Sequence, residues 1–431
     1  MVSAAARRIE RLAQIEPAER RAVVLAFTCY FLLFASYYVL RPVRDTVATV
    51  FGVEQLPEFF TATLVGSVIA SWLYALVARR VRLRALLPGM FWFWLVNIVL
   101  FSVLFRLAAR SVWVGGSYYV WFSVMNLFMV SVFWSLMADL FTPAQATRLF
   151  GLIAAGGSTG AIAGPIVTRI FVAPLGLAGL LVLAAVAFVA VIALVHLLMR
   201  EKERLRASGA RVQRTTLEHG LAGHPLEGFR ELLASGYSAR QAGFMFLMTW
   251  VNTVAYFFQT ELVARALPGI TGRAVAIADI ALVVNVASAL ILLFGLGHIM
   301  RRFGVTTGLV LNPLIMIGAF IAIALSPTLF MIQALQVVRS VSQYAIARPS
   351  REICFTVVDQ AGRYRTKNVI DTVIYRLGDA SSAWVQDGLR AAGLRIAGCA
   401  AVGIGVCVLW GAVALGLGRR YEQLRKQRET I

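Results

Sequence analysis

The chain has 431 residues, of which 59% are hydrophobic and 14% are charged, and its mean hydropathy is +0.77. A soluble protein carries roughly 25% charged residues, so this composition excludes an ordinary soluble protein and indicates a membrane protein with many spans. Lys and Arg number 41 against 21 Asp and Glu, but most of the basic residues lie in short connections between apolar segments, where they report topology rather than a nucleic-acid partner.

About twelve segments approach the ~20 apolar residues that a helix needs to cross a bilayer. They are expected near 21–50, 56–78, 85–106, 112–139, 148–172, 174–199, 240–266, 272–299, 305–326, 328–358, 367–390 and 393–418. With the N-terminus in the cytoplasm, about 28 Lys and Arg fall inside and about 7 outside, so both termini are predicted to be cytoplasmic. The four cysteines have no metal-like spacing, and neither a metal nor a cofactor is expected.

The connections divide the chain into two halves. The predicted parts are a cytoplasmic amphipathic segment 1–20, a six-helix bundle 21–199, a cytoplasmic central loop 200–239, a second six-helix bundle 240–418 and a basic cytoplasmic tail 419–431. The halves echo each other weakly, since Arg79-Arg80 followed by Pro88 resembles Arg301-Arg302 followed by Pro313. Parallel half-repeats of this kind occur in transporters that bind a solute in a cavity between two bundles.

Charged residues interrupt the end of the first apolar segment. Tyr37, Arg41, Arg44 and Asp45 share one face of a helix at spacings of i, i+4, i+7 and i+8. Charge inside a membrane helix costs at least a few kcal/mol, so such residues usually face a water-filled cavity or a partner charge. The alternative is that the helix has ended there and the arginines extend to the membrane surface.

Three further polar residues lie in or beside apolar segments. Asn126 either lines the cavity or bonds a neighbouring helix, and Asp139 is expected at a cytoplasmic helix end in a structural role. Asp279 either binds a coupling proton or pairs with a basic group, and we favour pairing.

The fifth segment is rich in glycine. Gly156, Gly160 and Gly164 repeat every four residues and are followed by Pro165. Small residues at this spacing let two helices approach closely, so a helix-packing role is predicted. The run from Gly160 to Pro165 is similar to the fifth-helix motif of antiporters in the major facilitator superfamily, without that motif's trailing glycine pair.

The tenth and eleventh segments form a second charged region. Substrate contacts are predicted for Arg339, Gln343, Arg348, Lys367, Tyr375 and Arg376, as they are for Tyr37, Arg41, Arg44, Asp45 and Asn126. Gating or charge pairing is predicted for Arg351, Glu352, Asp371 and Asp379, together with Asp139 and Asp279. Arginine suits this task because its planar guanidinium stays charged and binds phosphate with two hydrogen bonds.

Several motifs occur in the order found in one known family. Leu40-Arg41-Pro42-Val43-Arg44-Asp45-Thr46 resembles the first-helix Leu-Arg-x-x-Lys-Asp-Thr of the ATP/ADP translocases, with arginine in place of the lysine. The other matches are Val132-Phe133-Trp134, the run from Tyr344 to Glu352, and Lys367-Asn368-Val369-Ile370-Asp371. The resemblance implies the fold of the major facilitator superfamily, the inner membrane of a bacterium, a monomer, and exchange of nucleotides engaged by Arg44.

One departure from the family bears on the substrate. Its nucleotide carriers have glutamates in the fourth and seventh helices, where this chain reads Val124-Met125-Asn126-Leu127 and Asn252-Thr253-Val254-Ala255. A proton-coupled transporter of a different organic anion and a non-transporting scaffold therefore remain alternatives to nucleotide exchange. The chain has no sequence motif of an intramembrane enzyme, and the expected partners are a small anionic solute and membrane lipid.

Overall fold

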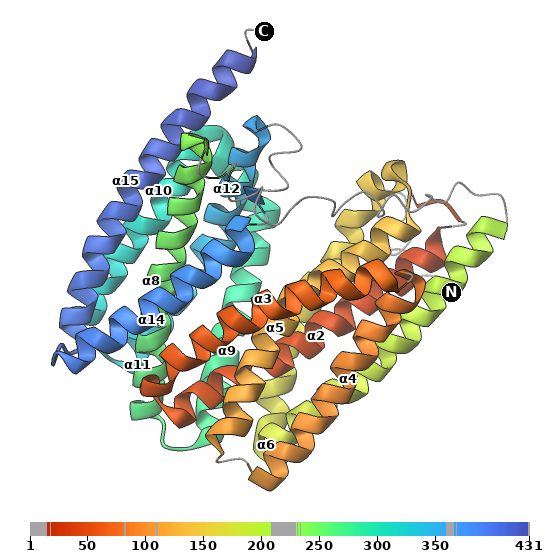
Figure 1. Cartoon of the computed structure of the whole chain (residues 1–431), viewed down its shortest axis with the longest axis horizontal. Helices are drawn as coiled ribbons and strands as arrows, with labels where there is room; N and C mark the ends of the chain where they lie inside the picture. Colours follow the sequence, from red (N-terminus) through yellow and green to blue (C-terminus); the bar gives the residue numbers. More distant parts are fainter. Residues whose placement is uncertain are drawn as a thin grey trace. The chain divides into compact units, whose positions relative to one another are not determined.

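The computed structural model describes residues 15–17, 19–81, 83–108, 111–207, 230, 232, 234–358, 366, 367 and 369–429. Nearly all of these residues are helical (Figure 1). The predicted amphipathic segment 1–20 and the central loop 200–239 lie largely outside the described residues.

The first half of the chain folds into long helices. They are α2 (Arg20–Phe51), the short η1 (Val53–Gln55), α3 (Leu56–Arg80), α4 (Leu83–Ala108), α5 (Val112–Leu140) and α6 (Pro143–Ala207). The last of these is two helices joined at Gly176, whose φ of 65° and ψ of −175° break the helical geometry. A positive φ suits glycine, because a side chain would clash there. The break lies within a few residues of the predicted boundary between the fifth and sixth segments.

The second half contains more interruptions. Its elements are α8 (Gly236–Ala266), α9 (Ile270–Leu290), η3 (Ile291–Gly295), α10 (Leu296–Leu325), α11 (Leu329–Ser342), η4 (Gln343–Ala347), α12 (Arg348–Cys354), η5 (Phe355–Val357), η6 (Ile370–Ile374), α14 (Tyr375–Ala391) and α15 (Ile396–Glu429). Helix α10 breaks at Gly304, which has a φ of 75°. The segments η3, η4 and η6 are π-helical turns that continue the helices beside them.

Twelve long helical segments result among the described residues once α6 and α10 are divided at their glycines and the π-turns are joined to their neighbours. Eight helices in the described part of the chain are long and apolar enough to cross a membrane. The prediction of an all-α, multi-pass membrane protein is therefore confirmed.

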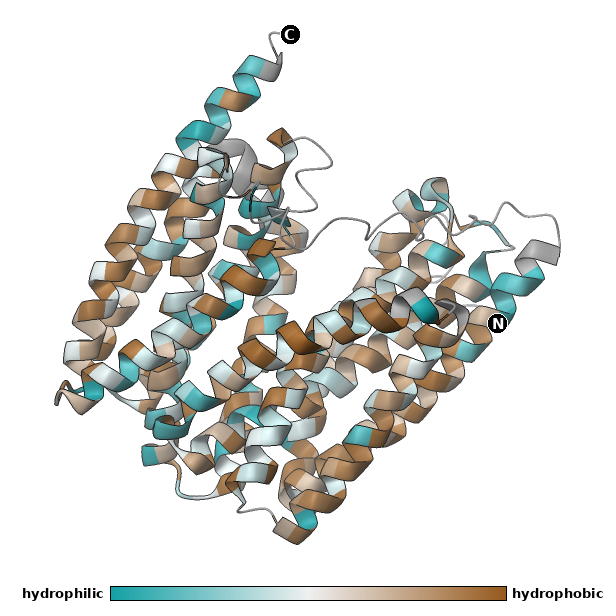
Figure 2. Cartoon of the chain, viewed as in Figure 1, coloured by the Kyte–Doolittle hydropathy of each residue, from teal (hydrophilic) through white to brown (hydrophobic). Residues whose placement is uncertain are grey.

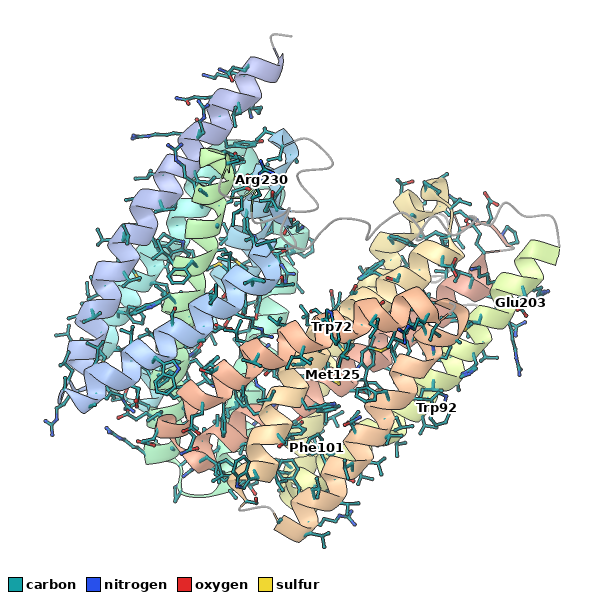
Figure 3. All side chains as sticks on the ribbon, viewed as in Figure 1. Trp72, Trp92, Phe101, Met125, Glu203 and Arg230 are labelled. Carbon is teal, nitrogen blue, oxygen red and sulfur yellow. The ribbon has the colours of Figure 1, made fainter. Side chains whose placement is uncertain are left out.

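The outer surface of the helices is apolar, as a lipid-facing surface must be. Trp72 and Trp92 are 65% and 50% exposed (Figure 3), whereas Trp94, two positions after Trp92, is only 2% exposed. Apolar residues are spread along the length of the helices, and polar residues gather towards the C-terminal end of α15 (Figure 2). This pattern is typical of a protein whose surroundings are as apolar as its interior.

The chain divides into two compact units. The first comprises residues 1–45, 69–221 and 277–282, and within it α4 packs along α6. The second comprises residues 46–68, 222–276 and 283–431, and within it α10 packs along α15 and α14 packs along α8. The predicted bundle boundaries at 21–199 and 240–418 stay a prediction.

Candidate functional site

Arg41, Arg44 and Asp45 lie close together on α2. The Nε and Nη2 atoms of Arg44 lie 2.8 and 2.5 Å from Oδ1 of Asp45. The Nε of Arg41 lies 3.9 Å from the other carboxylate oxygen, Oδ2. One buried carboxylate thus contacts two guanidinium groups, and the three side chains together carry a formal charge of +1.

Aromatic rings of α5 lie beside Arg44. The guanidinium carbon lies 5.0 Å from the ring centre of Tyr119 and 5.8 Å from that of Phe122. The Nη1 atom also contacts the Ser123 hydroxyl at 3.5 Å. A cation is attracted to the face of an aromatic ring within about 6 Å, most strongly where water is scarce. We call Arg41, Arg44, Asp45, Tyr119, Phe122 and Ser123 the α2 cluster.

The arginines of the α2 cluster remain partly accessible. Their side chains are 26% exposed for Arg41 and 20% for Arg44, whereas that of Asp45 is 6% exposed. Tyr37 is buried, and its ring stacks on that of Phe122 with 5.1 Å between the ring centres, so it packs against the α2 cluster. The arrangement holds two guanidinium groups in place and leaves part of each exposed.

A second polar group surrounds Arg339 on α11. Its guanidinium donates to Gln336 Oε1 at 2.9 Å, to Asn252 Oδ1 at 2.8 Å, to Gln343 Oε1 at 3.1 Å and to Ser340 Oγ at 3.0 Å. Four neutral oxygens fix the orientation of the side chain without removing its charge.

Helix α14 contributes a neighbouring charged set. Asp379 is 6% exposed and accepts a hydrogen bond from Thr253 Oγ1 at 2.9 Å. Its other oxygen lies 3.5 Å from Arg376 Nη1, and the Arg376 guanidinium lies 5.5 Å from the ring centre of Tyr375. Tyr375 is within electrostatic reach of Arg339 as well. We use the name α11–α14 cluster for Thr253, Arg339, Tyr375, Arg376 and Asp379 together with Asn252, Gln336, Ser340 and Gln343.

A separate ion-pair group forms around Arg351. This arginine is 4% exposed, and its Nη1 lies 2.7 Å from Asp371 Oδ1 and its Nη2 3.1 Å from Glu352 Oε1. Glu352 also pairs with Lys367, whose Nζ lies 5.7 Å from the ring centre of Phe355. Lys367 thus lies in this ion-pair group, whereas Arg348, at the start of α12, is exposed.

The remaining polar residues predicted from the sequence lie in separate places. Asp139 pairs with Lys202 of α6, and Asp279 Oδ1 lies 2.7 Å from Arg169 Nη1. Asn126 is exposed on α5, one turn from the buried Ser123 of the α2 cluster.

The glycines of α6 lie directly against α2. An added Cβ atom would lie 2.5 Å from the Phe27 carbonyl oxygen at Gly156, 2.2 Å from that of Phe31 at Gly160, and 2.6 Å from that of Ala35 at Gly164. The three oxygens, like the three glycines, are four residues apart. Pro165, which follows Gly164 inside the helix, is buried. This contact presses α6 against the turns of α2 that precede Arg41.

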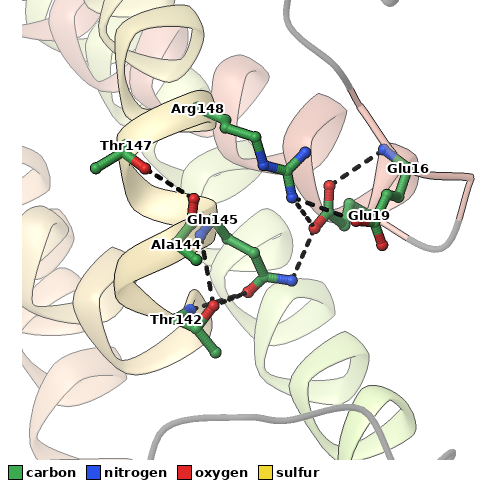
Figure 4. A network of polar contacts seen from close by, with 7 residues as sticks. All are labelled: Glu16, Glu19, Thr142, Ala144, Gln145, Thr147 and Arg148. Carbon is green, nitrogen blue, oxygen red and sulfur yellow. Dashed lines mark hydrogen bonds and ion pairs between the residues drawn. The ribbon is translucent and has the colours of Figure 1, made fainter.

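A network at the start of α2 was not anticipated from the sequence. Glu19 is 3% exposed and accepts hydrogen bonds from Gln145 Nε2 at 2.8 Å and Arg148 Nη2 at 2.9 Å (Figure 4). Glu16 Oε1 lies 3.5 Å from the same arginine atom. These contacts join the beginning of α2 to the beginning of α6, and no short-range sequence pattern identifies them.

The sequence also did not identify the residues that orient the arginines. Tyr119, Phe122 and Gln336 occur in apolar helices and resemble ordinary core residues. Only their contacts with charged side chains distinguish them. Within the described residues, no three His, Cys, Asp or Glu side chains come together in a group that could hold a metal.

No family model matches the chain, and no curated protein is similar to it in sequence. Solved structures are similar in fold. A mutant of the nucleoside transporter NupG matches with a TM-score of 0.66 at 12% identity, covering 94% of this chain and 99% of that one. A POT family transporter in complex with 5-aminolevulinic acid matches with a TM-score of 0.62 at 13% identity, covering 94% and 96%.

A bacterial homolog of the human lysosomal transporter Spinster, in an inward-facing and unoccupied conformation, gives a TM-score of 0.57 at 16% identity. The alignment covers 96% of this chain and 98% of that one. At such low identity the likeness establishes the fold alone. The chain has the all-α fold of these membrane transporters over nearly its whole length.

Proposed function

We propose that the chain is a secondary transporter that exchanges anionic, phosphorylated solutes across a bacterial inner membrane, and that it acts as a monomer with cytoplasmic termini. One observation carries the proposal: Arg41 and Arg44 lie within a long apolar helix, held in place by Asp45 and by aromatic rings, and are 26% and 20% exposed. The similar structures are of transporters rather than enzymes, which supports a carrier.

The chemistry of the α2 cluster favours an anion. Two arginines and one aspartate place excess positive charge in a membrane helix, where charge is costly and is usually retained for a function. Arg44 uses Nε and Nη2 for Asp45, and its Nη1 lies 3.5 Å from the Ser123 hydroxyl. A phosphate oxygen that replaced this 3.5 Å contact would gain a charge-assisted hydrogen bond.

Helix α11 supplies a second cation of the same kind. Arg339 is oriented by Asn252, Gln336 and Gln343 through neutral amide oxygens. These three acceptors orient the side chain and do not neutralise its charge. We infer that Arg339 is a second cation that contacts the solute.

Nucleotides and smaller organic phosphates are the leading solutes. The motifs shared with the ATP/ADP translocases favour a nucleotide. Asn252, in the part of the seventh helix where nucleotide carriers have a glutamate, favours a solute that carries more negative charge near Arg339.

Uptake by reconstituted vesicles tests the proposal. Vesicles preloaded with an unlabelled organic phosphate are expected to take up the labelled compound by exchange. Arg44→Ala should weaken apparent affinity or uptake at least about tenfold, because a charge-assisted hydrogen bond contributes ~1.5–3 kcal/mol. Arg44→Lys should restore part of it, because lysine keeps the charge and loses the planar fork.

The matched control is Arg106→Ala, which removes an exposed arginine from the end of α4. This variant should transport as the wild type does. Wild-type rates in Arg44→Ala, or equal losses in both variants, would contradict the assignment and leave the α2 arginines as structural residues. If a pH gradient drives uptake into vesicles that contain no counter-solute, the transporter is proton-coupled and is not an exchanger.

A further inference from the structure

A pocket of about 860 Å³ lies in the second unit, where the first turn of α8 meets the C-terminal part of α15. It is open to the outside and is separate from both clusters described above. Three arginines line it: Arg240 of α8, and Arg419 and Arg420 of α15. Val357, Val358 and Leu424 form an apolar part of its wall.

The described wall of the pocket carries three positive charges. All three arginines are exposed, and none of the described residues that line the pocket is an aspartate or glutamate. Glu422 is close in sequence, but its Oε1 accepts a hydrogen bond from Thr306 of α10 at 2.7 Å. The beginning of α8 adds to the potential, because the first N–H groups of a helix have no partner within it and carry partial positive charge.

The position of the arginines along their helices indicates the depth of the pocket in the membrane. Arg419 and Arg420 directly follow the apolar run Ile396–Gly418 of α15, and Arg240 precedes the apolar part of α8. Basic residues at the ends of apolar spans lie among the lipid headgroups of a membrane. A pocket at the C-terminal end of the apolar run of α15 is therefore expected at the level of the lipid phosphate groups.

We propose that this pocket binds the headgroup of an anionic phospholipid, with the phosphate held by Arg240, Arg419 and Arg420. Each guanidinium can give a phosphate two hydrogen bonds. Val357, Val358 and Leu424 would contact the glycerol and the upper acyl chain, a contact that a soluble phosphate cannot make. Basic pockets between membrane helices are suited to such headgroups. A bound lipid would join the start of α8 to α15 and so stabilise the second unit.

Lipid titration of the purified protein in a neutral detergent tests this site. Phosphatidylglycerol should raise the midpoint of thermal unfolding, and native mass spectrometry should show its retention over phosphatidylcholine. The variant Arg240→Gln/Arg419→Gln/Arg420→Gln should bind phosphatidylglycerol at least about tenfold more weakly, since it loses several charge-assisted hydrogen bonds. The control Arg106→Gln/Arg395→Gln removes one exposed arginine of α4 and the exposed arginine that precedes α15, and it should bind as the wild type does.

Three outcomes would overturn the proposal. They are equal effects of phosphatidylglycerol and phosphatidylcholine, unchanged affinity in the triple variant, and equal stabilisation by inorganic phosphate alone. If the triple variant does not fold, Arg240→Gln and Arg420→Gln are tested singly, and wild-type affinity in both refutes the site. None of these measurements depends on transport.

Discussion

Replacing Gly160 with alanine should separate α6 from α2 and lower stability. The new Cβ would lie 2.2 Å from the Phe31 carbonyl oxygen and 3.0 Å from the Ala35 nitrogen. Real Cβ contacts are essentially never closer than 3.0 Å, so the two backbones must move apart by at least 0.8 Å. A backbone oxygen cannot rotate away as a side chain can. Overpacking of this kind costs about 1–3 kcal/mol.

Gly151 provides a matched control on the same helix. An added Cβ there meets nothing within 4 Å, so Gly151→Ala should leave stability unchanged or raise it by about 0.5–1 kcal/mol, because alanine favours the helix. Thermal unfolding of both variants in detergent measures the difference in stability. Uptake by vesicles shows whether the displacement of α6 also disturbs the α2 cluster. If Gly160→Ala unfolds at the same temperature as Gly151→Ala, the close packing of α6 on α2 is refuted.

Three further predictions concern other parts of the molecule. Arg351→Met should lower the free energy of unfolding by about 1–3 kcal/mol, because Asp371 and Glu352 lose their buried cation. The loss is smaller than for a fully buried pair, because both carboxylates are about one-third exposed to solvent. Lys367→Met, which loses a more exposed pair, should cost less, and the reverse order would contradict the importance of Arg351. Arg339→Gln should reduce uptake at least about tenfold with unfolding unchanged, since a charge-assisted contact with the solute is lost; normal uptake would exclude Arg339 from the solute's path. A cysteine at Arg204 should resist impermeant thiol reagents added outside intact cells, and ready labelling would reverse the proposed orientation.

The helices could be predicted from the sequence because the bilayer fixes both their length and their composition. The predicted breaks between 172 and 174 and between 299 and 305 fall close to Gly176 and Gly304, where a positive φ ends one helix and begins the next. The π-helical turns could not be predicted, because residue spacing in the sequence is interpreted with a regular α-helical period of about 3.6 residues per turn. The turn η4 inserts an additional residue between Arg339 and Arg348, just before Pro349, whose missing N–H favours such a turn.

The candidate site was predictable in part. Charge within an apolar segment is rare, so Arg41, Arg44 and Arg339 stand out in the sequence, and their roles stay predictions. Their partners do not stand out. Ser123 is 79 residues from Arg44 in the sequence, and Asn252 is 87 residues from Arg339. Their contacts with these arginines appear only in the folded chain. Long-range pairing of this kind leaves no local pattern.

The most direct test of the central claim compares one solute with and without its phosphate. Vesicles containing the wild-type protein are offered a labelled organic phosphate, such as a nucleotide, and in parallel its dephosphorylated counterpart, with protein-free vesicles as the background. We predict exchange of the phosphorylated compound, inhibition by unlabelled organic phosphates, and no protein-dependent uptake of the uncharged counterpart. Preferred uptake of the uncharged compound, or of a cation, would contradict an anion carrier built around the α2 arginines.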